Sequence, residues 1–265
     1  MSFPMTGVPP VISGGGENAK TTAWVNAVVA AGGSVSAGRR TTVNTLFDSL
    51  DSNSLTTKLN RLWLLAAENT QSASIDLINL QTYSLVNSPT FTTDRGYAGN
   101  GSSSYLNLNT ANCGTQNSAM YGMALRTNQP AENSTSMGCD DSGTASSTIN
   151  PTWGDGSMYW AINDDEGHAG VTPPASRVGI YIVTRTASTT APCYKDGASL
   201  GTSTTTSNGT SALNFFLGCT NHSSGAHGFT VNQHSATFIG NSGFNSTEAS
   251  NFNTNLQTYL TAVGA

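Results

Sequence analysis

The sequence contains little charge. Only 9% of its 265 residues are Asp, Glu, Lys or Arg, against about 25% in an average globular domain. Ten Lys and Arg residues stand against fifteen Asp and Glu residues, which gives a formal net charge of −5. A protein that follows a phosphate backbone needs a basic surface, so this composition argues against a nucleic-acid partner.

Long apolar runs are also missing. No segment approaches the ~20 apolar residues that a membrane-spanning helix needs, so no membrane span is expected. Residues 1–16 lack a basic cluster followed by an apolar stretch, and we expect no secretory signal peptide there. Pro4, Pro9, Pro10 and the glycine run 14–16 instead predict an extended arm over residues 1–16. This arm either docks on a partner or is loose.

Cysteine is scarce and irregularly spaced. The four cysteines are Cys113, Cys139, Cys193 and Cys219, and no two have C-x-x-C spacing. A zinc finger or ribbon is therefore not expected. Two interpretations remain open: four buried thiols, which a reducing cytosol favours, or two disulfides, which function outside the cell would favour.

Small uncharged polar residues are abundant instead. The chain has 37 Thr, 33 Ser, 26 Asn and 28 Gly, which together make up nearly half of its length. Threonine favours strands with a wet face, while Gly, Asn and Ser favour turns. This composition predicts a many-stranded β protein.

The segment 17–69 has helical rather than strand periodicity. Apolar residues recur every three or four positions over 22–31 and again after Ser36, which is placed to cap a second helix. A third helix is expected over 56–68, apolar around most of its circumference. A helix so apolar must be buried, so the segment is expected to pack on the following domain. A last helix is expected over 247–263, capped by Ser246 or Thr247.

From about residue 70 onward the pattern changes to short apolar or alternating runs. Clusters of Gly, Asn, Ser and Asp separate these runs, as in a sandwich or barrel. The dipeptide Asp196-Gly197 predicts a tight hairpin, because both central positions of a type I′ turn need a positive φ. The expected strands cover residues 75–80, 104–108, 120–125, 158–162, 178–183, 193–195, 213–217 and 235–239.

The order of these runs resembles a known fold family. Residues 177–185, 193–201 and 212–219 are similar to successive strands of the laminin-G-like, concanavalin A-like jelly roll, with a Tyr-x-Asp-Gly motif in the second strand. Residues 23–36 and 62–69 resemble the helical lead-in of tailed-bacteriophage and prophage structural proteins that carry this jelly roll. The resemblance implies a mainly β protein: an antiparallel jelly-roll β-sandwich over 70–265, with a short N-terminal helical segment over 17–69 and a C-terminal helix.

The same resemblance implies a function. It suggests a non-enzymatic bacteriophage virion structural protein, a capsid decoration or fibre component that displays the jelly roll on the virion surface. The arm and helical segment would then contact other virion proteins, and a symmetric homo-oligomer would be natural. The alternative is a carbohydrate-binding adhesin that recognises a host-surface glycan. A polysaccharide-cleaving enzyme is the third hypothesis.

Catalytic motifs are missing from the sequence. A glycosidase needs two carboxylates roughly 5–10 Å apart, and the glucanases with this jelly roll carry them as Glu-x-Asp-x-x-Glu or Glu-x-Asp-x-Glu on one strand. Neither string occurs here, and neither does a Gly-x-Ser-x-Gly nucleophile elbow. We therefore expect no enzyme and no required cofactor.

Four residues are candidates for glycan binding: Trp153, Asp155, Tyr159 and Trp160. Flat aromatic rings stack on sugar rings, and a carboxylate accepts hydrogen bonds from sugar hydroxyls. Core aromatics give the same pattern, and strand alternation would bury one of Tyr159 and Trp160 and expose the other.

The densest acidic stretch follows directly. Asn163, Asp164, Asp165 and Glu166 carry the oxygen ligands that calcium prefers, although their spacing does not match an EF-hand loop. A solvated turn explains the same residues. The acidic turn at Asp140 is predicted to be solvated. His222 and His227 lack a helix that would align them, so they are not expected to bind a metal.

Overall fold

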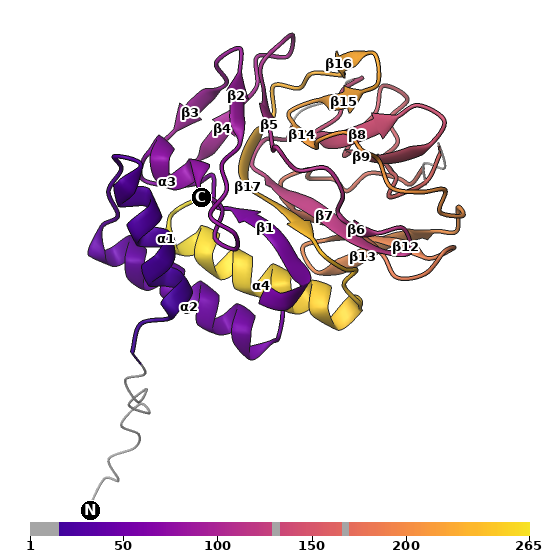
Figure 1. The fold of residues 1–265 in the computed structure, drawn as a ribbon. Helices are drawn as coiled ribbons and strands as arrows, with labels where there is room; N and C mark the ends of the chain where they lie inside the picture. Colours follow the sequence, from indigo (N-terminus) through magenta and orange to yellow (C-terminus); the bar gives the residue numbers. More distant parts are fainter. Residues whose placement is uncertain (1–15, 129–132, 166–169) are drawn as a thin grey trace, which may run out of the picture.

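The computed structural model describes residues 16–128, 133–165 and 170–265. Nearly all of the predicted arm, and Glu166, lie outside these residues. The described chain forms three layers: a helical layer, a large sheet beneath it, and a second sheet on the other side of the first (Figure 1).

The helical layer contains the predicted helices at both ends of the chain. Ser36 caps α2, as predicted, by accepting a hydrogen bond from the Arg39 amide at 3.2 Å. The last helix begins one residue earlier than expected, because Asn245 and Glu248 form a reciprocal capping box. The helices are α1 (Ala19–Ala30), α2 (Ala37–Ser52), the short α3 (Thr70–Ser74) and α4 (Ser246–Ala262), with a 3-10 turn η1 at Thr56–Lys58.

The third predicted helix, over 56–68, is wrong. Residues Leu59–Trp63 form a strand, β1, that pairs antiparallel with β17 (Gln233–Gly240). The side chain of Leu62 packs in the core beneath the helices, whereas Trp63 packs between the sheets. A strand buried on both faces has a continuous apolar run, which periodicity alone does not distinguish from a buried helix.

The strand expected over 75–80 is also absent. Only Ile75 forms an isolated bridge, to Thr82, and the intervening residues turn around Asp76. The Asp76 carboxylate accepts hydrogen bonds from the backbone amides of Ile78 and Gln81 at 2.8 and 2.6 Å. This local side-chain bonding competes with the ladder of a sheet.

The first sheet has nine strands among the described residues. Its order is β13-β12-β11-β7-β17-β4-β3, with β1 also paired to β17 and β6 to β7, and all of these pairs are antiparallel. The strands not yet given are β3 (Thr90–Thr92), β4 (Gly96–Ala98), β6 (Gly114–Thr115), β7 (Ser118–Leu125), β11 (Gly179–Arg185), β12 (Ala191–Lys195) and β13 (Ala198–Ser203).

The second sheet has eight strands in the described part of the chain. Its order is β10-β9-β8-β14-β5-β2, and the hairpin β15–β16 joins it through a parallel pairing of β15 with β8. The strands are β2 (Ser84–Val86), β5 (Tyr105–Asn107), β8 (Met137–Asp141), β9 (Ala145–Asn150), β10 (Tyr159–Trp160), β14 (Phe216–Leu217), β15 (Thr220–His222) and β16 (Gly225–His227).

Alternation along the central strands explains the layers. On β7, Met120 packs toward the helices, while Tyr121 and Met123 pack between the two sheets. On β11, Ile182 and Val183 divide in the same way. The first sheet is thus covered on both faces, which confirms a mainly β, sandwich-like fold with few helices.

The predicted hairpin at Asp196-Gly197 is confirmed. It joins β12 to β13, and the two residues have φ values of 51° and 79°. Both values lie in the left-handed region that a type I′ turn requires. None of the helices in the described ranges has the length and apolar character needed to cross a bilayer.

Candidate functional site

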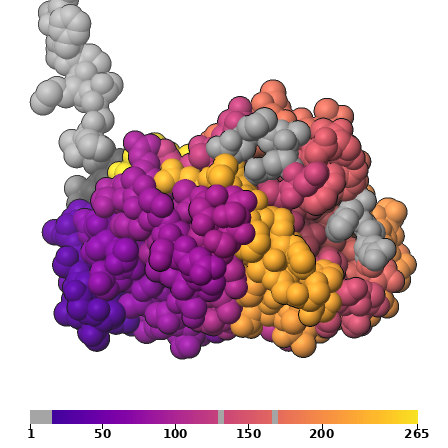
Figure 2. Space-filling model, turned by 90° about the horizontal axis from the view of Figure 1, so that it is seen from above, coloured from indigo at the N-terminus to yellow at the C-terminus, as the bar shows by residue number. Residues whose placement is uncertain are grey.

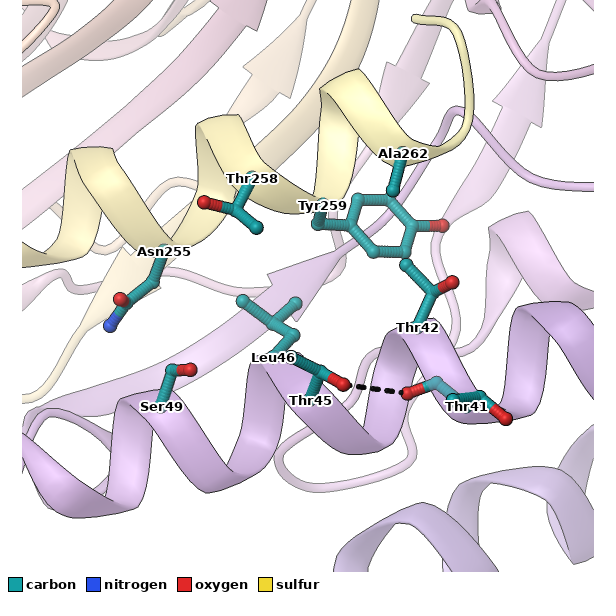
Figure 3. Close-up of a pocket in the computed structure, with 9 residues that line it drawn as sticks. All are labelled: Thr41, Thr42, Thr45, Leu46, Ser49, Asn255, Thr258, Tyr259 and Ala262. Atoms are coloured by element: carbon teal, nitrogen blue, oxygen red, sulfur yellow. Dashed lines mark hydrogen bonds between the residues drawn. The ribbon is translucent and has the colours of Figure 1, made fainter. Parts of the chain in front are cut away.

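Two hollows on the described surface differ in their chemistry. The first lies between α2 and α4 and has a volume of about 150 Å³ (Figure 3). Its threonine hydroxyls are bonded back to their own helices: Thr45 donates to the Thr41 carbonyl at 3.1 Å and Thr258 to the Thr254 carbonyl at 2.8 Å. Methyl groups, Leu46 and Tyr259 make up most of the lining, so the hollow is mainly apolar; its other polar residues are Ser49 and Asn255, whose Nδ2 has no partner among the described residues.

The second hollow, the outer-sheet groove, is larger and polar. It has a volume of about 390 Å³, within the usual range of ligand pockets, about 300–1,000 Å³. Strands β8, β9, β15 and β16 and the loop after β9 form it, at the end of the molecule away from the indigo N-terminal helices (Figures 1 and 2). Its lining residues are Thr135, Asp140, Thr148, Asn150, Trp153, Thr220, His222, Ser224, His227 and Gly228.

Strand alternation turns the polar lining outward. On β9, Ile149 packs into the core between the sheets, so its neighbours Thr148 and Asn150 lie on the opposite face. On β8, Cys139 packs into the same core and Asp140 lines the groove. The groove therefore occupies the face of the second sheet that the first sheet does not cover.

Gly138 allows close packing at the centre of this face. It pairs with Thr148 of β9 on one side and with Thr220 of β15 on the other, so the middle position of this row has no side chain. A Cβ atom there would come within 2.8 Å of the Thr148 methyl carbon. The lack of a side chain at Gly138 therefore lets Thr148 pack closely against β8.

Two acceptors in the groove are unused. Asn150 is only 5% exposed, and its Oδ1 atom has no hydrogen-bond partner among the described residues. No hydrogen bond from the described chain reaches the partly exposed Asp140 carboxylate either. A buried amide oxygen without a partner is costly, of order 1–3 kcal/mol, so a ligand donor at this position would recover that cost.

The hairpin β15–β16 adds a chain of three polar groups. The Ser224 amide donates to Nδ1 of His222 at 3.1 Å, which assigns that nitrogen as an acceptor. The Ser224 hydroxyl, 2.7 Å from the same nitrogen, then also donates to it and accepts from Nε2 of His227 at 2.8 Å. By this assignment His222 keeps an Nε2–H donor and His227 keeps a free Nδ1 acceptor, both of which a ligand can use.

Of the four predicted glycan contacts, Trp153 lines the groove. Its backbone is fixed in a tight turn, because its amide donates to the Ser157 carbonyl at 2.7 Å and its carbonyl accepts from Gly156 at 2.8 Å. The indole is half-buried. Trp153 therefore contributes a partly exposed aromatic residue to the lining of the groove.

The other three predicted contacts lie outside the groove lining. Asp155 and Tyr159 bond to each other at 2.6 Å, and this bond together with the Ser157 amide lowers the pKa of the Asp155 carboxyl. Trp160 is fully buried between the sheets, where its Nε1 donates to the Ala191 carbonyl at 3.0 Å. The prediction that Trp160 contacts a glycan is therefore wrong, and alternation buries it while Tyr159 stays partly exposed.

The predicted calcium ligands are not brought together. Asn163 and Asp164 are buried, and the Asp164 carboxylate pairs with the fully buried Arg185 guanidinium at 3.1 Å. Asp165 is exposed, and Glu166 lies outside the described residues. A buried cation already neutralises Asp164, which corrects its assignment as a calcium ligand. In the described chain, no group of three or more His, Cys, Asp or Glu side chains is placed to hold a metal.

All four cysteines are buried free thiols. Of the two interpretations left open, the structure therefore contains the thiols and not the disulfides. Burial raises the pKa of Cys113 and of Cys219 to about 12, and raises that of Cys139 and Cys193 further. Such thiols are inert as nucleophiles, so they serve as core packing.

The sequence interpretation missed most of the groove. Asp140 was assigned to a solvated turn and His222 and His227 to a loop, yet Asp140 lies within β8 and the histidines end the paired strands β15 and β16. The useful signal was the two-residue alternation around Asn150. It identifies an outward polar row once β9 is known to be a strand.

Comparisons with known proteins give likeness in fold. No protein-family model and no curated protein sequence matches the chain. A mutant of Trypanosoma rangeli sialidase displaying trans-sialidase activity matches with a TM-score of 0.53 at 12% identity, over 84% of this chain and 40% of that one. The same sialidase in complex with the inhibitor DANA matches with a TM-score of 0.52 at 11% identity, over 81% and 38% of the two chains.

These matches cover part of the sialidases and concern the fold. The chain spans about two fifths of the length of the sialidases, and at this identity the match shows a shared fold alone. Domain 4 of a GH43 extracellular arabinanase from Geobacillus stearothermophilus, in complex with arabinotriose, matches at 10% identity over 74% of this chain and 98% of that one. Its TM-score of 0.48 carries no weight.

The comparisons correct the expected function. A non-enzymatic bacteriophage virion structural protein was expected, but the solved structures reported above with a TM-score over 0.5 are sialidases, and the same sialidase also matches in complex with sialic acid. The virion role is therefore wrong. The alternative, carbohydrate binding, agrees better with these neighbours.

Proposed function

We propose that the chain is a carbohydrate-binding module whose sandwich is a concanavalin A-like jelly roll. The outer-sheet groove would hold a saccharide, with one sugar ring against Trp153. A first, antiparallel sheet packed face to face with a second, mixed sheet and a fold shared with sialidases support this proposal. A host-surface glycan is the partner that it implies.

One observation carries the proposal. Asn150 lines a hollow of about 390 Å³ and has a buried Oδ1 with no partner among the described residues, and the half-buried Trp153 lines the same hollow. An aromatic surface contacts the apolar face of a sugar ring, and unsatisfied acceptors bind its hydroxyls. The α2–α4 hollow also has an aromatic residue and one unpartnered polar atom, the Asn255 Nδ2 donor, but it is smaller, at about 150 Å³, and has no unpartnered acceptor among its lining residues.

Binding is favoured over hydrolysis by the groove chemistry. Cleavage of a glycosidic bond normally uses a pair of carboxyl groups on either side of the bond. Asp140 is the one carboxylate among the lining residues of the groove. A single carboxylate surrounded by Thr, Asn and His hydrogen-bonding groups suits recognition of hydroxyls.

A glycan array followed by calorimetric titration tests the proposal. We expect at least one oligosaccharide to bind the full chain, and Trp153→Ala to weaken binding by about 10-fold or more, since a stacked ring contributes about 1–3 kcal/mol. Leu85→Ala, which truncates an apolar side chain that is 48% exposed on β2, is the matched control and should leave the affinity unchanged. Equal losses in both variants, or no binding by any glycan, would overturn the proposal.

A further inference from the structure

We infer that the outer-sheet groove selects neutral saccharides and rejects those that carry a carboxylate, and that Asn150 reads a hydroxyl or amide N–H donor of the ligand. This inference rests on the proposed function and specifies its ligand. It separates the chain from the sialidases that share its fold, whose name denotes action on sialic acid, an acidic sugar.

The first argument is the position of every fixed positive charge. All ten Lys and Arg residues fall within the described part of the chain, and none of them lines the groove. Recognition of a carboxylate normally uses such a residue, above all a bidentate arginine. The groove therefore has no permanent cation to pair with an acidic sugar.

One arginine, Arg177, bonds to the residue that precedes Trp153 of the groove. Arg177 donates from Nε to the Thr152 hydroxyl at 2.6 Å, next to Trp153 in sequence. Another arginine, Arg185, is fully buried against Asp164 on the interior side of the sheet. Arg185 is therefore closed to a ligand, and Arg177, whose Nε is held by Thr152, is not among the residues that line the groove.

The second argument is the one charge that the groove does hold. The Asp140 carboxylate lies on the outer face beside His222, its register partner on β15, and no hydrogen bond from the described residues neutralises it. Like charges repel more strongly in a partly enclosed hollow than in water. A bound uronate or sialate would therefore meet repulsion without a compensating ion pair.

The third argument is the polarity of the hydrogen bonds that the groove offers. Asn150 Oδ1 and the Asp140 carboxylate are acceptors, and His227 adds a third acceptor through its free Nδ1. Donors line the groove as well, namely His222 Nε2–H and the hydroxyls of Thr135 and Thr220. A ligand rich in hydroxyl donors satisfies this set, whereas a carboxylate can only accept.

The test is a binding comparison on matched glycan pairs. Each pair consists of a neutral oligosaccharide and the same oligosaccharide with a terminal sialic acid or with one sugar oxidised to its uronic acid. We expect the full chain at pH 8 and low salt to bind neutral members at least 10-fold more tightly than their acidic partners. Asp140→Asn, which is isosteric but uncharged, should narrow that difference.

The outcomes separate the inference from the function on which it rests. Equal or tighter binding of acidic members would overturn the inference and leave saccharide binding in place. An unchanged difference in Asp140→Asn would overturn the role of that carboxylate. If no member of any pair binds, the proposed function itself is overturned.

A second arm tests Asn150. Deoxy derivatives of the bound sugar remove one hydroxyl donor at a time, and one position should cost the wild-type chain at least 10-fold in affinity. In Asn150→Ala that position should lose its effect, while the other deoxy positions keep theirs. If Asn150→Ala fails to fold, the wild-type series still decides, because uniform tolerance of every deoxy sugar contradicts a donor-reading site.

Discussion

The two sheets of the sandwich differ in what covers their outer faces. The first sheet turns Met120, Ile182 and Phe238 outward and buries them under α2 and α4. The second sheet turns Asp140 and Asn150 outward and leaves them lining an open groove. Both patterns follow from the same two-residue alternation, so the difference lies in residue type. The apolar row of the first sheet is covered by helices, and the polar row of the second sheet lines the outer-sheet groove.

The helix-covered face should dominate stability. Phe238 is fully buried, and its ring centroid lies 4.6 Å from that of Phe252 on α4. We expect Phe238→Ala to lower the free energy of unfolding by about 3–5 kcal/mol, because it removes a large core side chain and leaves a cavity. Urea denaturation monitored by circular dichroism measures this change. An equal loss in Thr148→Ala, on the open face, would contradict the comparison.

The interior between the sheets should be almost as sensitive to loss of a charge. Asp164→Ala leaves the buried Arg185 guanidinium unpaired, so we expect it to destabilise the fold by about 3–5 kcal/mol. Burial already lowers the pKa of Arg185, an effect that Asp164 opposes. Thermal melts with and without millimolar calcium check this account. Stabilisation of the wild type, but not of Asp164→Ala, by calcium would show a metal ligand in place of an ion pair.

The free energy of unfolding should fall in acid because of a buried histidine on β17. His234 on β17 is buried, and burial lowers its pKa from 6.5 to about 3. Between these values the unfolded chain binds a proton that the folded chain rejects, so stability is lost as the pH falls below 6.5. The slope is at most about 1.4 kcal/mol per pH unit.

This pH effect can be isolated by substitution. Between pH 6.5 and pH 5, the wild type should lose about 2 kcal/mol more than His234→Asn in urea unfolding. Each variant is compared with itself at the two pH values, so a constant cost of the substitution cancels. Parallel losses in the two proteins would show that other groups carry the acid sensitivity.

The smallest effect is expected just beside the groove. Tyr159→Phe removes the bond between the hydroxyl and Asp155, both of which lie outside the groove lining. Saccharide affinity should change by less than about 2-fold and unfolding free energy by less than about 0.5 kcal/mol, as for an exposed substitution. Calorimetric titration measures the first value and urea denaturation the second. A loss comparable to that of Trp153→Ala would extend the site to these two residues.

The elements that local patterns determine were predictable from the sequence. The helices α1, α2 and α4 have apolar stripes at helical spacing, and the Asp196-Gly197 turn depends on two adjacent residues. Strand β1 was not predictable, because its apolar run is buried on both faces and resembles a buried helix. The Asp76 turn was missed because side-chain bonding to the backbone leaves no periodic signal.

The groove was predictable only in fragments. Trp153 was identified because an aromatic beside acidic and turn residues is visible locally. Asn150 and His222 lie 72 positions apart in sequence, and they share a groove only because β15 pairs parallel with β8 beside β9. A single sequence gives no register between such distant strands. Burial of Trp160 likewise depends on which face of β10 meets the first sheet.

The most direct measurement is the position of a bound saccharide, mapped by amide chemical-shift changes on the full chain titrated with the tightest neutral glycan from the array. The account predicts that the largest shifts fall on Asp140, Thr148, Asn150 and His222, with residues of the α2–α4 hollow unchanged. Shifts concentrated on Thr42, Leu46 and Tyr259, with the outer-sheet groove unchanged, would contradict it.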